Sequence, residues 1–86
     1  MRPQRDRLID LKERVAQVVA TDSTSPQYLY EPVVLALVEL SAYLYDLDHG
    51  CALERDAGRL IERTQRALAA LGSYSTLKHA RPHYAA

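Results

Sequence analysis

Residues 30–50 form the most apolar region of the chain, and as a helix they would be apolar around most of their circumference. The main apolar row repeats at alternating spacings of four and three residues, the pattern of a coiled-coil seam, and consists of Val33, Leu37, Leu40, Leu44 and Leu47. Ala36 and Tyr43 widen this row on one side. A second apolar row lies about 100° further round the helix and consists of Val34, Val38 and Tyr45. A helix with two apolar faces needs two sets of packing partners.

Two further amphipathic helices are predicted on either side of this region, over residues 4–20 and 52–71. The first carries one apolar stripe, made by Leu8, Leu11, Val15, Val18 and Val19. The second carries a longer stripe, made by Leu53, Ala57, Leu60, Ile61, Thr64, Ala67, Leu68 and Leu71. No segment of useful length alternates with the two-residue period of a strand, so the predicted fold class is all-α.

Pro32 decides where the central helix begins. It either starts that helix itself, after a short turn, or kinks a helix that starts at Pro26. We favour the first interpretation, with a helix over residues 31–49. Gly50 is predicted to end this helix, because glycine readily adopts the left-handed conformation that closes many helices. The link that follows is short, so the second and third helices are expected to form a central antiparallel hairpin.

Gly72 is the predicted end of the third helix for the same reason. Residues 73–86 have little periodicity and contain a proline, so a mobile tail is expected there. The helical domain is therefore predicted to span residues 1–72.

The apolar excess of the central helix predicts self-association. Each flanking helix is apolar on one face only, so together they leave part of the central helix uncovered. We therefore expect a symmetric homodimer with a four-helix-bundle-like core, in which the second helices meet through Val34, Val38, Glu39, Tyr43 and Tyr45. The alternative is a compact three-helix monomer in which residues 4–20 cover the second row.

The 11 basic and 11 acidic residues give no net charge, but their distribution is uneven. No lysine or arginine occurs between Val15 and Glu54, whereas arginines are frequent beyond that point. An acidic middle and basic ends are expected to pair with each other, within one chain or between two. Glu39 in particular is expected to meet an arginine of the third helix or of a second copy.

Several features favour a cytoplasmic protein. The first residues are charged throughout, so no secretory signal is expected. The longest apolar stretch is too short and too interrupted to cross a membrane, so no membrane contact is expected either. The single cysteine, Cys51, cannot form an internal disulfide and is expected to be buried. Frequent arginine and alanine favour a bacterial source.

No pattern typical of an enzyme or a cofactor site is found, so neither catalysis nor a cofactor is expected. His49 and Cys51 lie two residues apart, but Pro82 separates His79 from His83, so no metal site is expected. His49 is instead expected to bond to the carbonyl groups at the end of the central helix. The carboxylates of that helix lack the Glu-x-x-His pattern of a di-iron bundle.

Four arginines are expected on one face of the third helix, opposite its leucines: Arg55, Arg59, Arg63 and Arg66. Such a stripe is typical of proteins that contact phosphate backbones. Acidic residues are interleaved with it, however, and favour a solvated face with intrahelical ion pairs.

Together these observations favour a small, non-catalytic, homodimeric helical protein that acts as an adaptor, regulatory or accessory protein by binding another protein. The first alternative is a dimeric regulator that binds nucleic acid through the arginine stripe and the basic tail. The second is a helical protein that binds a small molecule in a pocket lined by Tyr28, Tyr30, Tyr43 and Tyr45.

Overall fold

The computed structural model of the protein describes residues 3–22 and 25–80, the last six of these by their backbone alone. Within these ranges the chain forms α1 (Gln4–Thr21), α2 (Gln27–Asp48), the 3₁₀-helix η1 (Glu54–Ala57) and α3 (Gly58–Ala80). The described residues form no strand, and the prediction of an all-α fold is confirmed.

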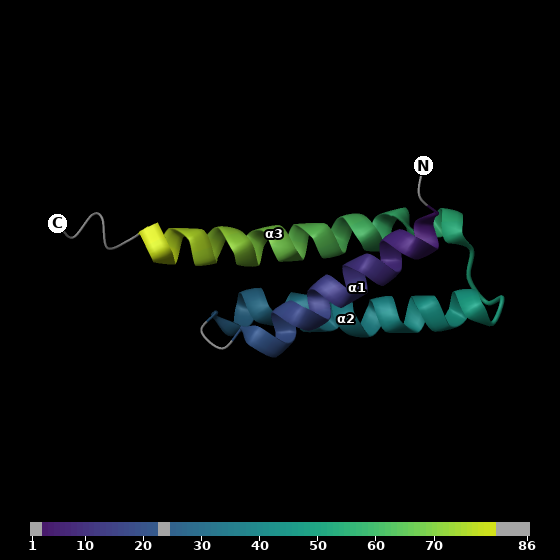
Figure 1. Cartoon of the computed structure of the whole chain (residues 1–86), viewed down its shortest axis with the longest axis horizontal. Helices are drawn as coiled ribbons and strands as arrows, with labels where there is room; N and C mark the ends of the chain where they lie inside the picture. Colours follow the sequence, from purple (N-terminus) through teal and green to yellow (C-terminus); the bar gives the residue numbers. More distant parts are fainter. Residues whose placement is uncertain (1–2, 23–24, 81–86) are drawn as a thin grey trace.

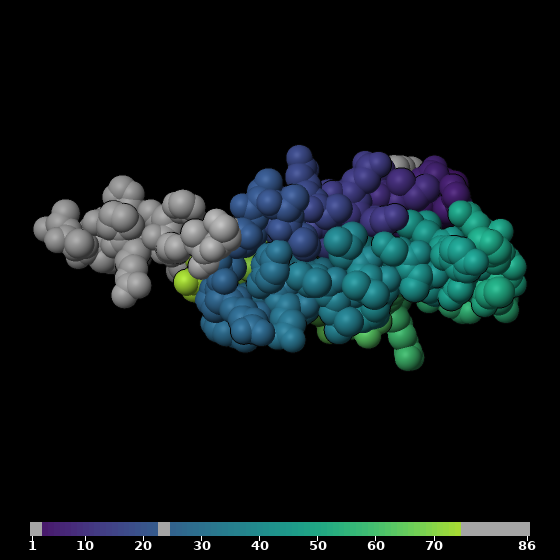
Figure 2. Space-filling model, turned by 90° about the horizontal axis from the view of Figure 1, so that it is seen from below, coloured from purple at the N-terminus to yellow at the C-terminus, as the bar shows by residue number. Residues whose placement is uncertain are grey.

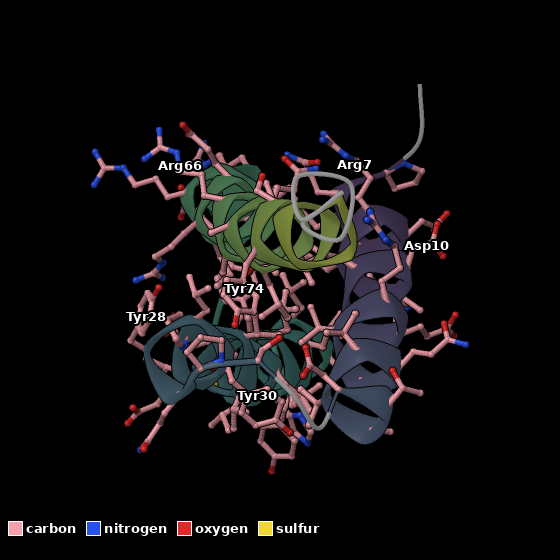
Figure 3. The ribbon with its side chains drawn as sticks, turned by 90° about the vertical axis from the view of Figure 1, so that its left-hand side faces the viewer. Arg7, Asp10, Tyr28, Tyr30, Arg66 and Tyr74 are labelled. Atoms are coloured by element: carbon pink, nitrogen blue, oxygen red, sulfur yellow. The ribbon has the colours of Figure 1, made fainter. Side chains whose placement is uncertain are left out.

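The three α-helices form an elongated bundle (Figure 1). α2 and α3 run antiparallel, as predicted, and α1 crosses them obliquely on one side (Figure 1). Viewed along the long axis, α1, α2 and α3 stand at the corners of a triangle (Figure 3). α3 projects beyond the ends of the other two helices at its C-terminal end (Figure 1).

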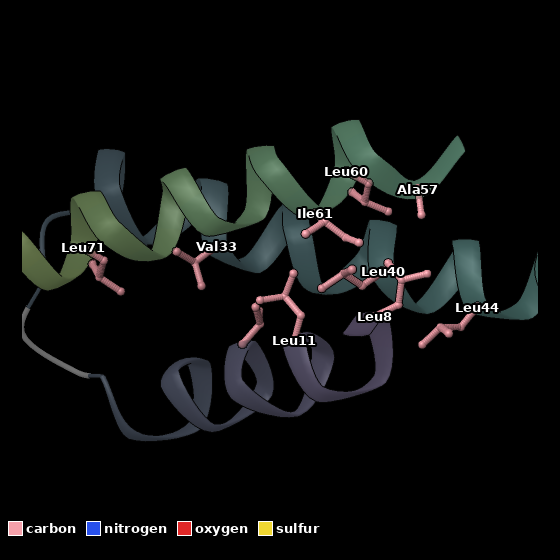
Figure 4. Close-up of a cluster of buried hydrophobic side chains, with 10 residues drawn as sticks. Leu8, Leu11, Val33, Leu40, Leu44, Ala57, Leu60, Ile61 and Leu71 are labelled. Atoms are coloured by element: carbon pink, nitrogen blue, oxygen red, sulfur yellow. The ribbon is translucent and has the colours of Figure 1, made fainter. Parts of the chain in front are cut away.

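The core lies where the three helices meet (Figure 4). Its largest fully buried side chains are Leu8, Val15, Val33, Leu40 and Thr64. Every buried residue of the described chain belongs to one of the apolar rows predicted from the sequence. Burying one aliphatic side chain of this size contributes about 1.5–3 kcal/mol, so these rows supply the main stabilisation of the bundle.

α2 begins at Gln27, so the prediction of a turn before Pro32 is wrong. The N–H of Tyr30 donates to the carbonyl of Pro26 at 3.0 Å, which closes the first turn. The Tyr30 hydroxyl donates to the carbonyl of Val19 at 2.9 Å, near the end of α1. Pro32 removes one hydrogen bond from the helix, but this contact with α1 holds the preceding turn in helical form.

The end of α2 confirms the predicted role of Gly50. This residue has a φ of 72°, in the left-handed region. Its N–H donates to the carbonyl of Leu47 at 3.2 Å, and the N–H of Cys51 donates to the carbonyl of Asp46 at 2.7 Å. These two hydrogen bonds form a Schellman motif, which satisfies carbonyl groups that the helix itself leaves unpaired.

α3 begins at Gly58, later than predicted, because η1 takes the place of its first turn. The N–H of Asp56 donates to the carbonyl of Leu53 at 3.1 Å as the chain enters this turn. Leu53 was expected on the apolar stripe of the third helix, but it precedes η1 and is 52% exposed.

α3 also continues to Ala80, past the end predicted at Gly72. Glycine inside a helix costs about 1 kcal/mol relative to alanine, which does not by itself end a helix. Leu71 is buried and Tyr74 is half-buried between α3 and α2, so packing continues beyond the glycine (Figure 3). The rest of the expected tail, residues 81–86, lies outside the described residues.

Candidate interaction surface

The face of α2 that points away from the core is apolar. Leu35, Val38 and Tyr45 are 57%, 60% and 63% exposed, and Ala42 is exposed between them. Their spacings of three, four and three residues place them in one line along the helix. We call these four residues the outer stripe. Figure 2 shows α2 lying along this face of the molecule with no other element across it.

Glu31 and His49 extend the outer stripe by one turn at each end, and both are exposed. The His49 ring stacks on Tyr45, with centroids 3.9 Å apart and an angle of 22° between the planes. Its Nδ1 lies 2.8 Å from the carbonyl oxygen of Tyr45, which confirms the expected contact with the end of the helix. A carbonyl oxygen can only accept, so Nδ1 carries the proton and Nε2 is the nitrogen available to a partner.

The outer stripe contains two of the five residues predicted at the interface, Val38 and Tyr45. Val34 is half-buried beside it. α1 leaves Val38 and Tyr45 exposed, so it does not cover the second apolar row as the monomer interpretation required. Sequence reasoning missed Leu35 and Ala42, although their spacing from Val38 and Tyr45 was a usable signal.

The other two predicted interface residues make contacts within the chain. The Tyr43 hydroxyl donates to the carbonyl of Leu53. Burial raises the pKa of Tyr43 above its ordinary value, and the negative charge of Asp56 raises this pKa further. Glu39 accepts a hydrogen bond from Arg63 at 2.7 Å, which confirms the predicted pairing with an arginine of the third helix. Both side chains therefore stabilise the hairpin.

A groove with a volume of about 360 Å³ lies between α2 and α3. Its lining includes Leu35, Ala36 and Glu39 from α2 and Leu60, Arg63 and Arg66 from α3. Arg66 points to the side of the bundle opposite α1 (Figure 3). Leu35 belongs to both the outer stripe and the groove, so the two form one continuous surface. No tyrosine lines this groove, so it is not the tyrosine pocket considered from the sequence.

The four arginines predicted on the third helix are all exposed, with Arg55 in η1 and Arg59, Arg63 and Arg66 on α3. Arg63 pairs with Glu39, and Arg66 pairs with Glu62 at 2.5 Å. Arg55 and Arg59 form no ion pair with other described residues. Half of this arginine face is therefore neutralised within the chain.

The acidic middle and basic ends of the chain pair with each other, as predicted. Arg5 of α1 reaches Asp48 at the end of α2, with 3.0 Å between nitrogen and oxygen. The pair of Glu39 and Arg63 joins α2 to α3 in the same way. Both pairs are partly exposed, and such pairs contribute little stability, about 1 kcal/mol at most. They fix the relative positions of the helices more than they stabilise them.

Of the histidine and cysteine residues considered for metal binding, only His49 and Cys51 have side chains that the structure describes. Among the residues that the structure describes, no three His, Cys, Asp or Glu side chains are arranged to hold a metal ion. Cys51 is exposed, so the expectation of burial is wrong; it follows the left-handed Gly50 at the tip of the hairpin. The side chain of His79 and the whole of His83 lie outside the described residues.

No protein-family model, curated protein or solved structure matches this chain at a significant level. Within the described part of the chain, every helix is too short or too polar to cross a membrane. The fold leaves the outer stripe in contact with water, and the exposure of large apolar side chains in one line on a helix is unfavourable.

Proposed function

We propose that the protein is a small, non-catalytic helical protein that forms a homodimer through the outer stripe and acts as an adaptor, regulatory or accessory protein. The observation that carries this proposal is the line of exposed apolar residues along α2. Soluble proteins seldom leave such a line in contact with water. Pairing of two copies through a two-fold symmetric interface covers the stripe of both at once.

The size of the chain supports association. A domain of 86 residues buries a modest fraction of its surface, so additional apolar burial between copies is a substantial gain. Each 100 Å² of apolar surface removed from water contributes about 2.5 kcal/mol before the entropic cost of association.

Electrostatics also permit two α2 helices to approach each other. All the charged residues of α2 are acidic, which by itself would oppose close packing. Two of them, Glu39 and Asp48, are already paired with Arg63 and Arg5. The repulsion between the helices is reduced accordingly.

A dimer of this kind would carry the arginine face twice, next to each groove. Arg55 and Arg59 have no ion-pair partner among the described residues, so they are the charges available to an acidic segment of another protein. The adjoining groove offers apolar contacts from Pro32, Leu60 and Ala67 to the same segment.

Sedimentation of a Val38→Glu variant tests the proposed dimer. Val38 is 60% exposed, so the substitution leaves the fold of a single chain intact but places a charge in the centre of the interface. We expect a dimeric wild type, a monomeric variant and equal helix content by circular dichroism. Gln65→Glu, on an exposed position of α3, is the matched control and should stay dimeric. A variant that sediments like the wild type would refute the proposed interface.

A dimeric regulator that binds nucleic acid is the second candidate, favoured by the unpaired Arg55 and Arg59. The double substitution Arg55→Ala and Arg59→Ala leaves the ion pair of Arg63 intact. If this candidate is correct, binding to duplex DNA weakens, and the dependence of log K on log salt becomes shallower by about 0.9 for each phosphate that the variant no longer neutralises. Unchanged affinity and slope would exclude it.

A further inference from the structure

We infer that two copies of the chain pair their α2 helices antiparallel, in one register, with Leu35 opposite Tyr45 of the second copy and Val38 opposite Ala42. This inference rests on the proposed homodimer and adds the orientation and register of the two helices. Three independent properties of the exposed face of α2 lead to it: its spacing, the sizes of its side chains and its charges.

The outer stripe, taken with Glu31 and His49 at its ends, has a spacing that is the same when it is read in either direction. The positions are separated by four, three, four, three and four residues, and they are Glu31, Leu35, Val38, Ala42, Tyr45 and His49. When one helix is reversed, every position of this set therefore meets a position of the same set in the second copy. The two-fold axis then passes α2 at the level of Leu40.

The sizes of the side chains also suit the antiparallel register. The smaller pair, Val38 with Ala42, lies next to the two-fold axis, and the larger pair, Leu35 with Tyr45, lies further out. Packed helices cross at an angle, so they are closest at the axis and diverge away from it. A parallel pairing would place Ala42 on Ala42 beside Tyr45 on Tyr45, which leaves a void next to a bulky layer.

The charges at the ends of the stripe favour the same orientation. In a parallel pair, Glu31 meets Glu31 of the second copy, and neither carboxylate has an ion-pair partner among the described residues. In the antiparallel pair, Glu31 meets His49 of the second copy, whose Nε2 is not engaged by the contact with Tyr45. Repulsion between the two Glu31 carboxylates disfavours the parallel arrangement and is absent from the antiparallel one.

Disulfide cross-linking in a Cys51→Ser background tests the register. Chains with Val38→Cys are mixed with chains of different mass that carry Ala42→Cys, and the mixture is oxidised mildly. Two cysteines form a disulfide only when their Cα atoms lie within about 7 Å. We therefore expect the mixed disulfide to form on the order of tenfold faster than either symmetric one. Chains with Gln65→Cys on exposed α3 give the rate of random collision.

The unmodified chain supplies a second readout. In the antiparallel dimer the two His49 residues are about 27 Å apart along the helix axis, at a rise of about 1.5 Å per residue. Cys51 lies two residues beyond His49, so the two Cys51 thiols are also far apart. Oxidation of the wild type should therefore give no disulfide above the collision rate. A parallel dimer would place the two exposed Cys51 thiols side by side and link them rapidly.

Exchange of the charges at positions 31 and 49 distinguishes the antiparallel from the parallel orientation of the two α2 helices. His49→Glu should weaken the dimer on the order of tenfold, because it opposes Glu31 at both ends. Adding Glu31→Lys should restore dimerisation if the helices are antiparallel, because opposite charges then meet at both ends. If the helices are parallel it should not restore dimerisation, because like charges still meet at both ends.

Symmetric disulfides at Val38→Cys, or cross-linking at the collision rate in a chain of dimeric mass, would overturn the register but leave the homodimer standing. A monomeric mass would overturn both.

Discussion

Gly50 and Gly72 are alike in their surroundings and opposite in backbone conformation. At both residues an added Cβ would meet no atom within 4 Å. Gly50 has a φ of 72°, whereas Gly72 lies inside α3. Gly50→Ala should lower the free energy of unfolding by about 1–2 kcal/mol, because the left-handed conformation is strained for an L-residue. Gly72→Ala should raise it by about 0.5–1 kcal/mol.

Urea denaturation of both variants measures these two changes in the free energy of unfolding. All samples are kept at one protein concentration, because the proposed dimer would unfold with a midpoint that depends on concentration. Shifts of the same sign would contradict the assignment of the two conformations.

Tyr43 links stability to alkaline pH. Burial, and then the charge of Asp56, raises its pKa in the folded state. The contribution of Tyr43 to the free energy of unfolding is therefore fully present below its pKa in the unfolded chain, which is about 10, and is lost as the pH rises through its pKa in the folded protein. Tyr43→Phe should reduce this alkaline loss. At neutral pH it should cost about 0.5–1.5 kcal/mol, because the hydrogen bond to the carbonyl of Leu53 is removed.

Urea unfolding between pH 7 and pH 11 measures both effects, with the exposed Tyr28→Phe on the same helix as the control. An alkaline loss that is the same in wild type and Tyr43→Phe would show that another group is responsible.

At the scale of the elements, α2 contains a proline where a helix normally has a donor. Pro32 has no N–H to give to the carbonyl of Tyr28, and its ring crowds that carbonyl. Pro32→Ala restores the hydrogen bond and should stabilise the protein by about 1–3 kcal/mol. Thermal unfolding monitored by circular dichroism measures the change, and Pro26→Ala, just before the helix, is the control. A loss of stability on Pro32→Ala would mean that the rigidity of proline in the unfolded chain outweighs the missing hydrogen bond.

The number and order of the helices could be predicted from the sequence, because apolar periodicity reports directly on burial. Their limits could not, because they depend on contacts between helices. The start of α2 depends on the hydroxyl of Tyr30 reaching the end of α1, and the continuation of α3 past Gly72 accompanies the half-buried Tyr74. Neither contact leaves a periodic signal in the chain.

The candidate surface could also be predicted only in part, because it too depends on how the helices contact each other. Val38 and Tyr45 stand out in the sequence as a row beyond the main seam. Leu35 and Ala42 have a spacing that fits the same row, but which side of α2 faces outward is fixed by the rotation of this helix between α1 and α3. That rotation follows from which residues enter the shared core, such as Ala36, and is a property of the folded bundle.

For the molecule as a whole, the bundle closes a core with three helices and still leaves one apolar line outside it. α1 and α3 cover the inner side of α2, and no described element covers the outer stripe. The homodimer that we propose would account for the apolar excess of α2 and would leave the exposed arginine face to a different partner.

The most direct measurement is the mass of the wild-type protein in solution, by light scattering over a concentration series. A homodimer formed through the outer stripe predicts a mass of twice the 9.7 kDa of one chain, falling toward that value only on dilution. A mass of 9.7 kDa at every concentration would contradict self-association and would leave the outer stripe to a different protein.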